Sequence, residues 1–441
     1  MAMKRSRKSA NVYYIYQLLA GVVFWSLFPL LLIIVLVTGK HRRGLAQRLG
    51  LSGVPLRRSD SRPRIWIHAA SIGEVRVAAV LIDYLKQKRP DTVIVISTMT
   101  LHGRDFARTL FEDLECFLAP LDVPFIVDWV LNRVDPNLYI CMETELWPLL
   151  IQKIHRSGRR NLLLNGRISD RTVASYQRLK IVFDPVIDSF DFIGAISDKD
   201  RDRFIRLGAL SERVEVTGNL KYDPLLKKPA KTTPQKWREL LDIDLVDTVV
   251  VGGSTHDPEE QILIEMIELF RRDGKSFVWL IAPRHLNRLP EIEALFTAVS
   301  IPYQHLSSCL ESGRKEEVII VDTIGELVEL YSIATLAFIG GSLCNYGGHN
   351  MYEAAVWSIP VLFGPHTQNF HMETEALVTA GGGFRVADPS GLKSMIGLLT
   401  SDQDSHQRAS AAAQAVVASQ QGAGEHQVEL VTRLLDARFA A

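Results

Sequence analysis

The feature that most constrains the fold is a repeated alternation of short apolar runs with amphipathic stretches after Arg62. Continuous apolar strands separated by helices indicate a parallel sheet with both faces covered. Helical patterns include residues 75–88, 123–132 and 145–157. Strands are expected in the first half at residues 64–69, 92–98, 116–119, 138–142, 161–164, 192–196 and 214–217.

The alternation is interrupted once. Residues 220–236 hold three prolines and five lysines, a composition typical of a linker. The sequence therefore predicts two doubly wound, Rossmann-like α/β domains facing a cleft, at 61–222 and 237–425, with a linker at 223–236 and a helical tail at 426–441. The second set of strands is expected at 248–252, 277–282, 318–321, 335–339, 361–363 and 384–386.

The N-terminal region, residues 1–60, has a different character. Residues 12–37 carry no charge, which is long enough to cross a bilayer, and three tyrosines lie at one end. A cleaved signal peptide is the alternative, but its apolar region would be shorter and a small-residue cleavage site would follow it. We expect a retained membrane anchor. Both flanks are basic and Pro29 can kink the helix, so spanning the membrane and dipping into one face stay open.

Charged residues are distributed unevenly along the chain. Lys+Arg and Asp+Glu are both 50, and this zero net charge argues against a general nucleic-acid binder. Ten basic residues precede the first acid, Asp60, so the leader carries +10 and the remainder 40 − 50 = −10. A basic leader suits an anionic surface. The four cysteines form no C-x-x-C pair, which favours neither a disulfide framework nor a zinc site.

Acidic residues follow two strands of the first half. Glu74 stands three residues after Ser71, as in a capping box, or it is a general base at a strand end. Glu143 and Glu145 follow another strand. A helix cap would account for one of them, and function is expected for the other.

In the second half, Gly252–His256 joins a strand to a helix, and Ser254 or Thr255 is a possible helix cap. Arg284 ends a strand and suits a phosphate or carboxylate, unless it is a plain surface arginine. The segment 340–350 holds four glycines, whose backbone N–H groups can approach a phosphate at a helix N-terminus. We interpret the acids of Asp198-Lys199-Asp200 as helix-capping residues.

Several motifs are missing from the sequence. No G-x-G-x-x-G follows the first strand of either half, and there is no Walker A motif, which argues against an NAD enzyme and a P-loop ATPase. Neither H-E-x-x-H nor G-x-S-x-G occurs.

The motifs that remain resemble one family, the bacterial 3-deoxy-D-manno-octulosonic acid (Kdo) transferases of lipopolysaccharide assembly. The similarity runs from about Tyr14 to beyond Phe384. Its motifs are H-A-A-S-I-G-E at 68–74, E-T-E-L-W-P at 143–148, V-T-G-N-L-K-Y-D at 216–223, G-S-T-H at 253–256, P-R-H at 283–285, D-T-I-G-E-L at 322–327, F-I-G-G-S-L at 338–343, G-G-H-N at 347–350 and G-P-H at 364–366.

This resemblance implies a GT-B glycosyltransferase that moves Kdo from CMP-Kdo to the lipid A precursor, lipid IVA, with inversion and without a metal or other cofactor. The first domain would bind the acceptor and the second the donor. Glu74 would be the base, with Glu143, Glu145 and Lys221 as further catalytic residues. The residues implied to contact CMP are Pro283, Arg284, Ile324, Gly325, Glu326, Asn350, Met351, Tyr352 and Glu353.

The resemblance also implies a location and partners. The anchor would lie in the bacterial inner membrane among phospholipids and the lipid A precursor, with the catalytic body on the cytoplasmic side and no nucleic-acid partner. Two rival interpretations stay open: a GT-B enzyme that uses a UDP-sugar, and a membrane-tethered lipid A-binding protein without catalysis. An oxidoreductase is disfavoured by the missing dinucleotide motif.

Overall fold

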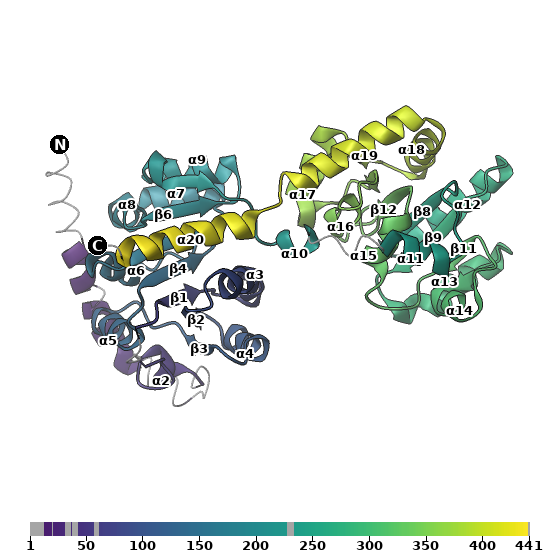
Figure 1. Cartoon of the computed structure of the whole chain (residues 1–441). Coiled ribbons are helices and arrows are strands. Elements are labelled where there is room, and N and C mark those ends of the chain that lie inside the picture. Colours follow the sequence, from purple (N-terminus) through teal and green to yellow (C-terminus); the bar gives the residue numbers. More distant parts are fainter. Residues whose placement is uncertain are drawn as a thin grey trace. The chain divides into compact units, whose positions relative to one another are not determined.

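A computed structural model of the chain describes residues 13–19, 21–30, 37, 43–56, 61–226 and 233–439. The chain divides into two compact units (Figure 1). Unit 1 comprises residues 1–224 and 422–441, and unit 2 comprises residues 225–421. Each unit contains one seven-stranded parallel sheet with helices around it, so the predicted α/β class with two sheets is confirmed. The expected cleft between them stays a prediction.

The sheet of unit 1 has the strand order β3-β2-β1-β4-β5-β6-β7, and every pair is parallel. All seven strands lie where an apolar run predicted them. Their bounds are β1 (Arg64–His68), β2 (Val93–Thr98), β3 (Glu115–Leu118), β4 (Leu138–Met142), β5 (Arg160–Gly166), β6 (Phe192–Ala195) and β7 (Val214–Val216).

Both faces of this sheet are buried, because alternate residues of each strand enter two separate cores. Trp66 belongs to the core that also contains α5 and α6 residues, whereas Ile65 and Ile67 belong to the core with α3 and α20. The helices of unit 1 are α2 (Leu45–Arg48), α3 (Ile72–Lys88), α4 (Leu101–Leu110), α5 (Pro124–Val134), α6 (Pro148–Arg156), α7 (Asp170–Arg178), α8 (Lys180–Asp188), α9 (Asp198–Arg206) and α20 (Ala423–Phe439), with a 3-10 turn η1 (Ser211–Arg213).

The C-terminal helix α20 returns to unit 1 and packs beside α3, as Figure 1 shows in yellow. Asp223 Oδ2 accepts the backbone N–H of Gly424 at 2.7 Å, and Gln427 Nε2 donates to Thr217 Oγ1 at 3.2 Å. The residues 216–223 that were noted as a sequence motif therefore hold the start of this helix. The predicted tail, 426–441, lies within α20 and two residues beyond it.

The sheet of unit 2 is also wholly parallel, with the order β10-β11-β9-β8-β12-β13-β14. Six of its strands were predicted. The seventh, β10, was not, because it has two polar residues at the edge of the sheet. The bounds are β8 (Val249–Thr255), β9 (Val278–Pro283), β10 (Gln304–His305), β11 (Val318–Ile320), β12 (Leu336–Ile339), β13 (Val361–Phe363) and β14 (Gly383–Arg385).

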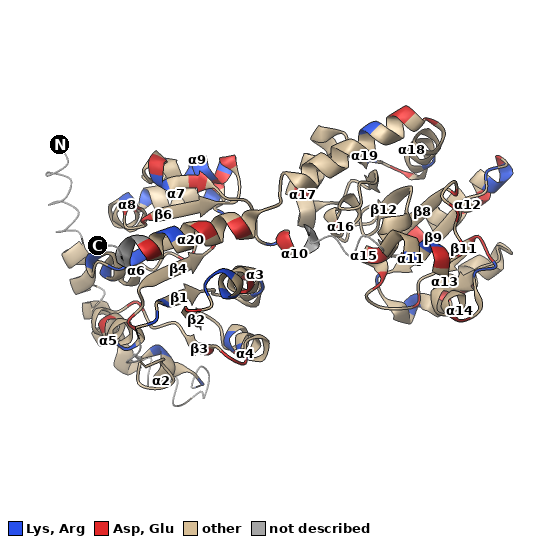
Figure 2. Cartoon of the chain, in the orientation of Figure 1, with Lys and Arg blue, Asp and Glu red and all other residues tan. Residues whose placement is uncertain are grey.

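Helices flank this second sheet, and charged residues in both units lie mainly on helices and loops (Figure 2). The helices of unit 2 are α11 (Thr233–Leu240), α12 (Glu259–Arg272), α13 (Leu289–Ala298), α14 (Leu306–Ser312), α15 (Leu327–Leu330), α16 (Tyr352–Ala355), α17 (His371–Ala380), α18 (Pro389–Ser401) and α19 (Gln403–Ala418), with 3-10 turns η2 (Leu286–Arg288), η3 (Tyr331–Ile333) and η4 (Gln368–Phe370). The expected linker overlaps α10 (Asp223–Leu226) and α11, and residues 227–232 lie outside the described residues.

Among the described residues, one helix is long and apolar enough to cross a membrane, Tyr13–Leu30, with a mean hydropathy of 1.4. Its Trp25 ring stacks on Phe125 of α5 at 5.2 Å between ring centroids, and the Arg156 guanidinium lies 3.9 Å from the Tyr13 ring centre. Most of the basic leader residues, and residues 31–36 of the expected anchor, lie outside the described residues.

Candidate functional site

Glu74 lies in the first turn of α3, just after β1, at the carboxyl edge of the first sheet. Ser71 is the N-cap of α3. Glu74 Oε2 accepts the Ala70 backbone N–H at 2.8 Å, and Oε1 accepts the Ser71 hydroxyl at 3.1 Å, so a capping arrangement is confirmed. These capping hydrogen bonds do not decide whether Glu74 is also a general base. Burial raises the pKa of Glu74 to about 7, assisted by the nearby Glu143 and opposed by the Ala70 N–H.

Glu143 and Glu145 follow β4, which pairs directly with β1. Both carboxylates contribute to the raised pKa of Glu74, so the structure brings three predicted acids into one electrostatic cluster. Burial also raises the pKa of Glu145, while Glu143 pairs with Arg167 at 3.0 Å. Glu143 has a φ of 57°, a backbone conformation that non-glycine residues seldom adopt.

The expectation that a helix cap accounts for one of these two acids is wrong. Helix α6 begins at Pro148 after Trp147, and neither glutamate lies in its first turn. Its free N–H groups at Leu149 and Leu150 donate instead to the two carboxylate oxygens of Asp122, at 3.0 and 2.9 Å. Asp122 lies in a loop 26 residues before the start of α6, so no local sequence pattern identifies it as the cap of this helix.

Lys221 lies after β7, the edge strand, which is three positions from β4 in the sheet. Its side chain is exposed, and its backbone N–H donates to Asn219 Oδ1 at 3.0 Å. The loop is supported from β5, since Asn165 Oδ1 accepts the Leu220 N–H at 2.9 Å. A catalytic role for Lys221 stays a prediction.

The glycine segment of unit 2 is organised by a carboxylate that the sequence analysis missed. Glu259, fully buried at the start of α12, accepts the backbone N–H groups of Gly341, Ser342 and Leu343 at 2.7, 3.0 and 2.9 Å. It also accepts the N–H of His256 at 3.0 Å. The first N–H groups of the segment are therefore already occupied by an internal anion and are not available to a phosphate.

The second part of the segment leads into α16, which has only four residues, Tyr352–Ala355. The expected helix N-terminus is thus short, and its dipole is correspondingly weak. Asn350 organises this turn, since Oδ1 accepts the Tyr352 N–H at 3.1 Å and Nδ2 donates to Glu353 at 3.4 Å. Met351 and Tyr352 are buried, so only Asn350 and Glu353 present side chains at the partly exposed surface.

Three histidines gather beside this loop. His256 after β8 and His349 of the loop have their Nε2 atoms 3.0 Å apart. The Tyr346 ring stacks on the His256 ring at 4.2 Å between centroids, and the His285 ring packs edge-on against His256 at 5.6 Å. Burial lowers the pKa of both His256 and His349, and neighbouring groups, among them His285 and Arg284, lower both further. Each histidine belongs to a noted motif, but none was predicted as a site residue.

The other predicted donor contacts lie at neighbouring strand ends. Pro283 is the last residue of β9 and pairs with Thr255 across the sheet. Ile324 is 85% exposed, and Gly325 has a φ of 114°. Glu326 Oε2 is buried and has no hydrogen-bond partner among the described residues. An unpartnered carboxylate oxygen is a natural acceptor for a hydroxyl of a ligand.

Two capping expectations have different outcomes. Thr255 and Ser254 do not cap α12, whose N-cap is Pro258, and the Thr255 hydroxyl instead donates to Glu260 at 2.9 Å. The acids of 198–200 do lie in the first turn of α9, as expected for residues at a helix start, but the N-cap is Ser197 and not an aspartate.

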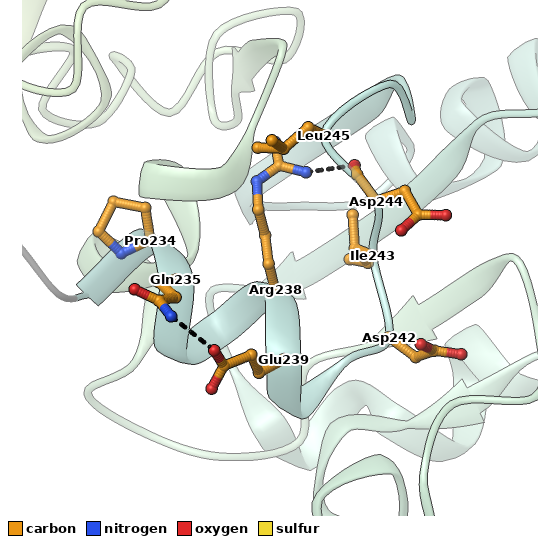
Figure 3. A pocket seen from close by; sticks show the side chains of 8 residues that line it. All are labelled: Pro234, Gln235, Arg238, Glu239, Asp242, Ile243, Asp244 and Leu245. Carbon is orange, nitrogen blue, oxygen red and sulfur yellow. Dashed lines mark hydrogen bonds between the residues drawn. The ribbon is translucent and has the colours of Figure 1, made fainter.

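A separate surface pocket of unit 2 contains none of the predicted site residues (Figure 3). Its polar side chains bond locally: Gln235 donates to Glu239 at 2.7 Å, and Arg238 donates to the carbonyl of Asp244. We assign no function to it. The pocket residues are Pro234, Gln235, Arg238, Glu239, Asp242, Ile243, Asp244 and Leu245.

In the described part of the chain, no group of three or more His, Cys, Asp and Glu residues is arranged to hold a metal ion.

The fold is shared with known sugar-nucleotide enzymes. The UDP-GlcNAc 2-epimerase of Neisseria meningitidis aligns with a TM-score of 0.54 at 15% identity, covering 84% of this chain and 99% of that one. A glycosyltransferase of Rickettsia africae aligns with a TM-score of 0.51 at 13% identity, covering 85% and 99%. These likenesses concern the GT-B fold alone.

Sequence comparisons identify the family. Residues 43–224 match the family model described as 3-deoxy-D-manno-octulosonic-acid transferase (kdotransferase). The 3-deoxy-D-manno-octulosonic acid transferase of Haemophilus influenzae is 30% identical over 90% of this chain and 92% of its own length. A bifunctional glycosyltransferase/methyltransferase of Fusobacterium nucleatum is 35% identical over 73% of this chain, which spans half of that protein. The chain therefore belongs to the Kdo transferase family, glycosyltransferases of lipopolysaccharide biosynthesis.

Proposed function

We propose that the protein transfers Kdo from CMP-Kdo to the lipid A precursor lipid IVA, with inversion at the anomeric carbon and Glu74 as general base. The observation that carries this proposal is the position of Glu74 at a strand end, beside two further carboxylates, with its pKa raised to about 7. A base with such a pKa is poised to accept and release a proton near neutral pH.

In this scheme, Glu74 takes the proton of an acceptor hydroxyl, and the resulting oxygen attacks the anomeric carbon of Kdo. The bond from that carbon to the phosphate oxygen breaks, and its electron pair leaves with CMP. Glu143 and Glu145 keep the proton affinity of Glu74 high, because like charges disfavour its ionised form. Lys221 or Arg167 would hold the carboxylate of Kdo.

Unit 2 would bind the donor. Arg284, whose side chain is exposed at the end of β9, suits the phosphate. Glu326 and Glu353 suit the ribose hydroxyls, since one oxygen of Glu326 has no partner among the described residues and burial raises the pKa of Glu353. Pro283, Ile324, Gly325 and residues 350–352 would line the nucleotide through their backbone. The proposed reaction requires no metal or other cofactor.

The apolar helix Tyr13–Leu30 and the basic leader support a location at the inner membrane. In this proposal the helix anchors the protein among phospholipids, and the leader attracts the phosphates of the lipid A precursor. The catalytic body then faces the cytoplasm, where the nucleotide sugar is available.

The test is an assay of the full-length protein with CMP-Kdo and lipid IVA in the presence of EDTA, with products identified by mass and the new anomeric centre by NMR. Addition of one or more Kdo masses with an inverted centre is expected. CMP, but not UDP, should compete with the donor. No transfer by a folded protein that binds CMP would contradict the acceptor, and preference for UDP would favour the rival GT-B donor.

A further inference from the structure

The pair formed by His256 and His349 joins two parts of unit 2 that are 93 residues apart in sequence. Their ring planes are nearly parallel, at 1°, and their Nε2 atoms are 3.0 Å apart. His256 is held at its own backbone by Glu259, which also holds the start of the loop that carries His349. Because Glu259 holds the backbone of both segments, the two Nε2 atoms are kept close together.

This distance restricts the protonation of the pair. Two Nε2 atoms at hydrogen-bond distance can share one hydrogen, with one ring donating and the other accepting. Two Nε2–H groups pointing at each other would repel. The pair can still gain one proton on the outer side of a ring, and the resulting imidazolium keeps the shared hydrogen bond.

The surroundings decide when that proton is present. Arg284 and His285 lie at the end of β9, and Tyr346 stacks on His256. The carboxylate of Glu260 is engaged by Arg288 of η2, at 2.8 and 3.2 Å. Burial lowers the pKa of His256, assisted by His285, Arg288 and Arg284 and opposed by Glu260. Burial, with His256 and Arg284, lowers the pKa of His349 to about 4, so the ligand-free pair is neutral at pH 7.

An anionic ligand opposes these effects, because its negative charge favours a positive charge on the pair that burial and the neighbouring groups disfavour. CMP-Kdo carries a phosphodiester and a carboxylate. We propose that the His256–His349 pair takes up one proton when this donor binds to unit 2, so that a shared imidazolium and Arg284 together hold the donor phosphate. The inference rests on the proposed function, which places the CMP moiety in this unit.

The proton also suits the step that follows. When the bond between the anomeric carbon and the phosphate oxygen breaks, CMP keeps the electron pair and its phosphate gains a negative charge. The imidazolium stabilises that charge while its proton stays on the histidine pair. His256 and His349 are then phosphate-binding residues, in addition to the predicted donor contacts.

The experiment measures proton uptake directly. Full-length protein in detergent is titrated by calorimetry with cytidine 5′-(methyl phosphate), a phosphodiester that has no proton of its own to exchange near neutral pH. Repeating the titration in buffers with different ionisation enthalpies gives the number of protons taken up. We expect net uptake at pH 7, none near pH 9.5, and none with cytidine, which lacks the phosphate. Affinity should fall by at most about tenfold per pH unit as pH rises through the pKa of the occupied pair.

Variants assign the proton. In the double variant His256→Gln/His349→Gln the two side chains can still hydrogen-bond, but neither can be protonated near neutral pH, so uptake should vanish while cytidine still binds. His371→Gln, an exposed histidine of α17, is the matched control and should keep the wild-type uptake. If the double variant does not fold, ¹⁵N NMR of histidine-labelled wild-type protein reports whether ligand converts a neutral ring to imidazolium.

The outcomes are distinct. Binding of the methyl phosphate without proton uptake, or uptake unchanged in the double variant His256→Gln/His349→Gln, overturns the inference and leaves the proposed function standing. Failure of both CMP and its methyl ester to bind overturns the proposed function, and the inference with it.

Discussion

The two sheets place a glutamate at comparable points, in the turn or first helical turn after a central strand, yet the two carboxylates have different surroundings. Glu74 follows β1 and accepts one backbone N–H and one hydroxyl, and burial raises its pKa to about 7. Glu259 follows β8, is fully buried and accepts four backbone N–H groups. The first is suited to exchange a proton, whereas the second serves as a structural anion.

The surrounding charges differ in the same way. Acids gather at the edge of the first sheet, whereas Arg284 and the histidine cluster lie at the edge of the second. In the proposed function, the same architecture provides a proton acceptor in unit 1 and an anion-binding surface in unit 2. The chemistry of each unit therefore depends on the residues at its strand ends and not on the sheet that carries them.

The largest expected effect is on Glu74. Glu74→Gln keeps a side-chain oxygen for the Ala70 N–H but removes the base, so we expect turnover to fall by about 10²–10⁴-fold. CMP binding and the melting temperature should be unchanged. The measurement is Kdo transfer followed by mass spectrometry. Near-normal turnover of Glu74→Gln would show that Glu74 only caps the helix, so that both glutamates would have structural roles.

Glu259 should show the opposite behaviour, with its main effect on stability. Glu259→Ala leaves four backbone N–H groups without their acceptor, so we expect the free energy of unfolding to fall by about 3 kcal/mol or more. Urea titration of the full-length protein measures it. Glu268→Ala on the same helix, which removes a surface pair with Arg272, is the control and should change it by about 1 kcal/mol or less. Equal stability of the two variants would contradict the role of Glu259.

The pH dependence of turnover provides a finer test. Because the pKa of Glu74 is raised to about 7, the basic form dominates only above that pH. With saturating donor, kcat should therefore rise about tenfold per unit as pH increases towards 7 and level off above it. A profile already level at pH 5 would show that the base has an unperturbed pKa.

The smallest effect is expected from the neighbouring acid. Glu143→Gln removes a like charge near Glu74 and frees Arg167, and both changes favour ionised Glu74. The rising limb of the kcat profile should shift to lower pH by about one unit or less. Glu215→Gln, on the edge strand β7, is the control and should leave the profile unchanged. A shift to higher pH would contradict the electrostatic cluster.

Much of this was accessible from sequence because strands buried on both faces are continuous apolar runs, and thirteen of the fourteen strands were predicted from them. The acids after β1 and β4 were identified as candidates because each follows such a run, but the pairing of these two strands, which places the acids at one edge, came from the structure. Edge strand β10 was missed because two polar residues carry no such pattern.

What the sequence by itself determined is local: the two α/β repeats, the apolar N-terminal segment, the capping turn at Ser71 and the family motifs. The tertiary structure alone decided which distant groups meet. Asp122 caps α6, Glu259 holds the glycine segment, and His256 pairs with His349. Periodicity encodes which face of an element is buried, whereas hydrogen bonds between loops depend on how strand order brings their ends together in space.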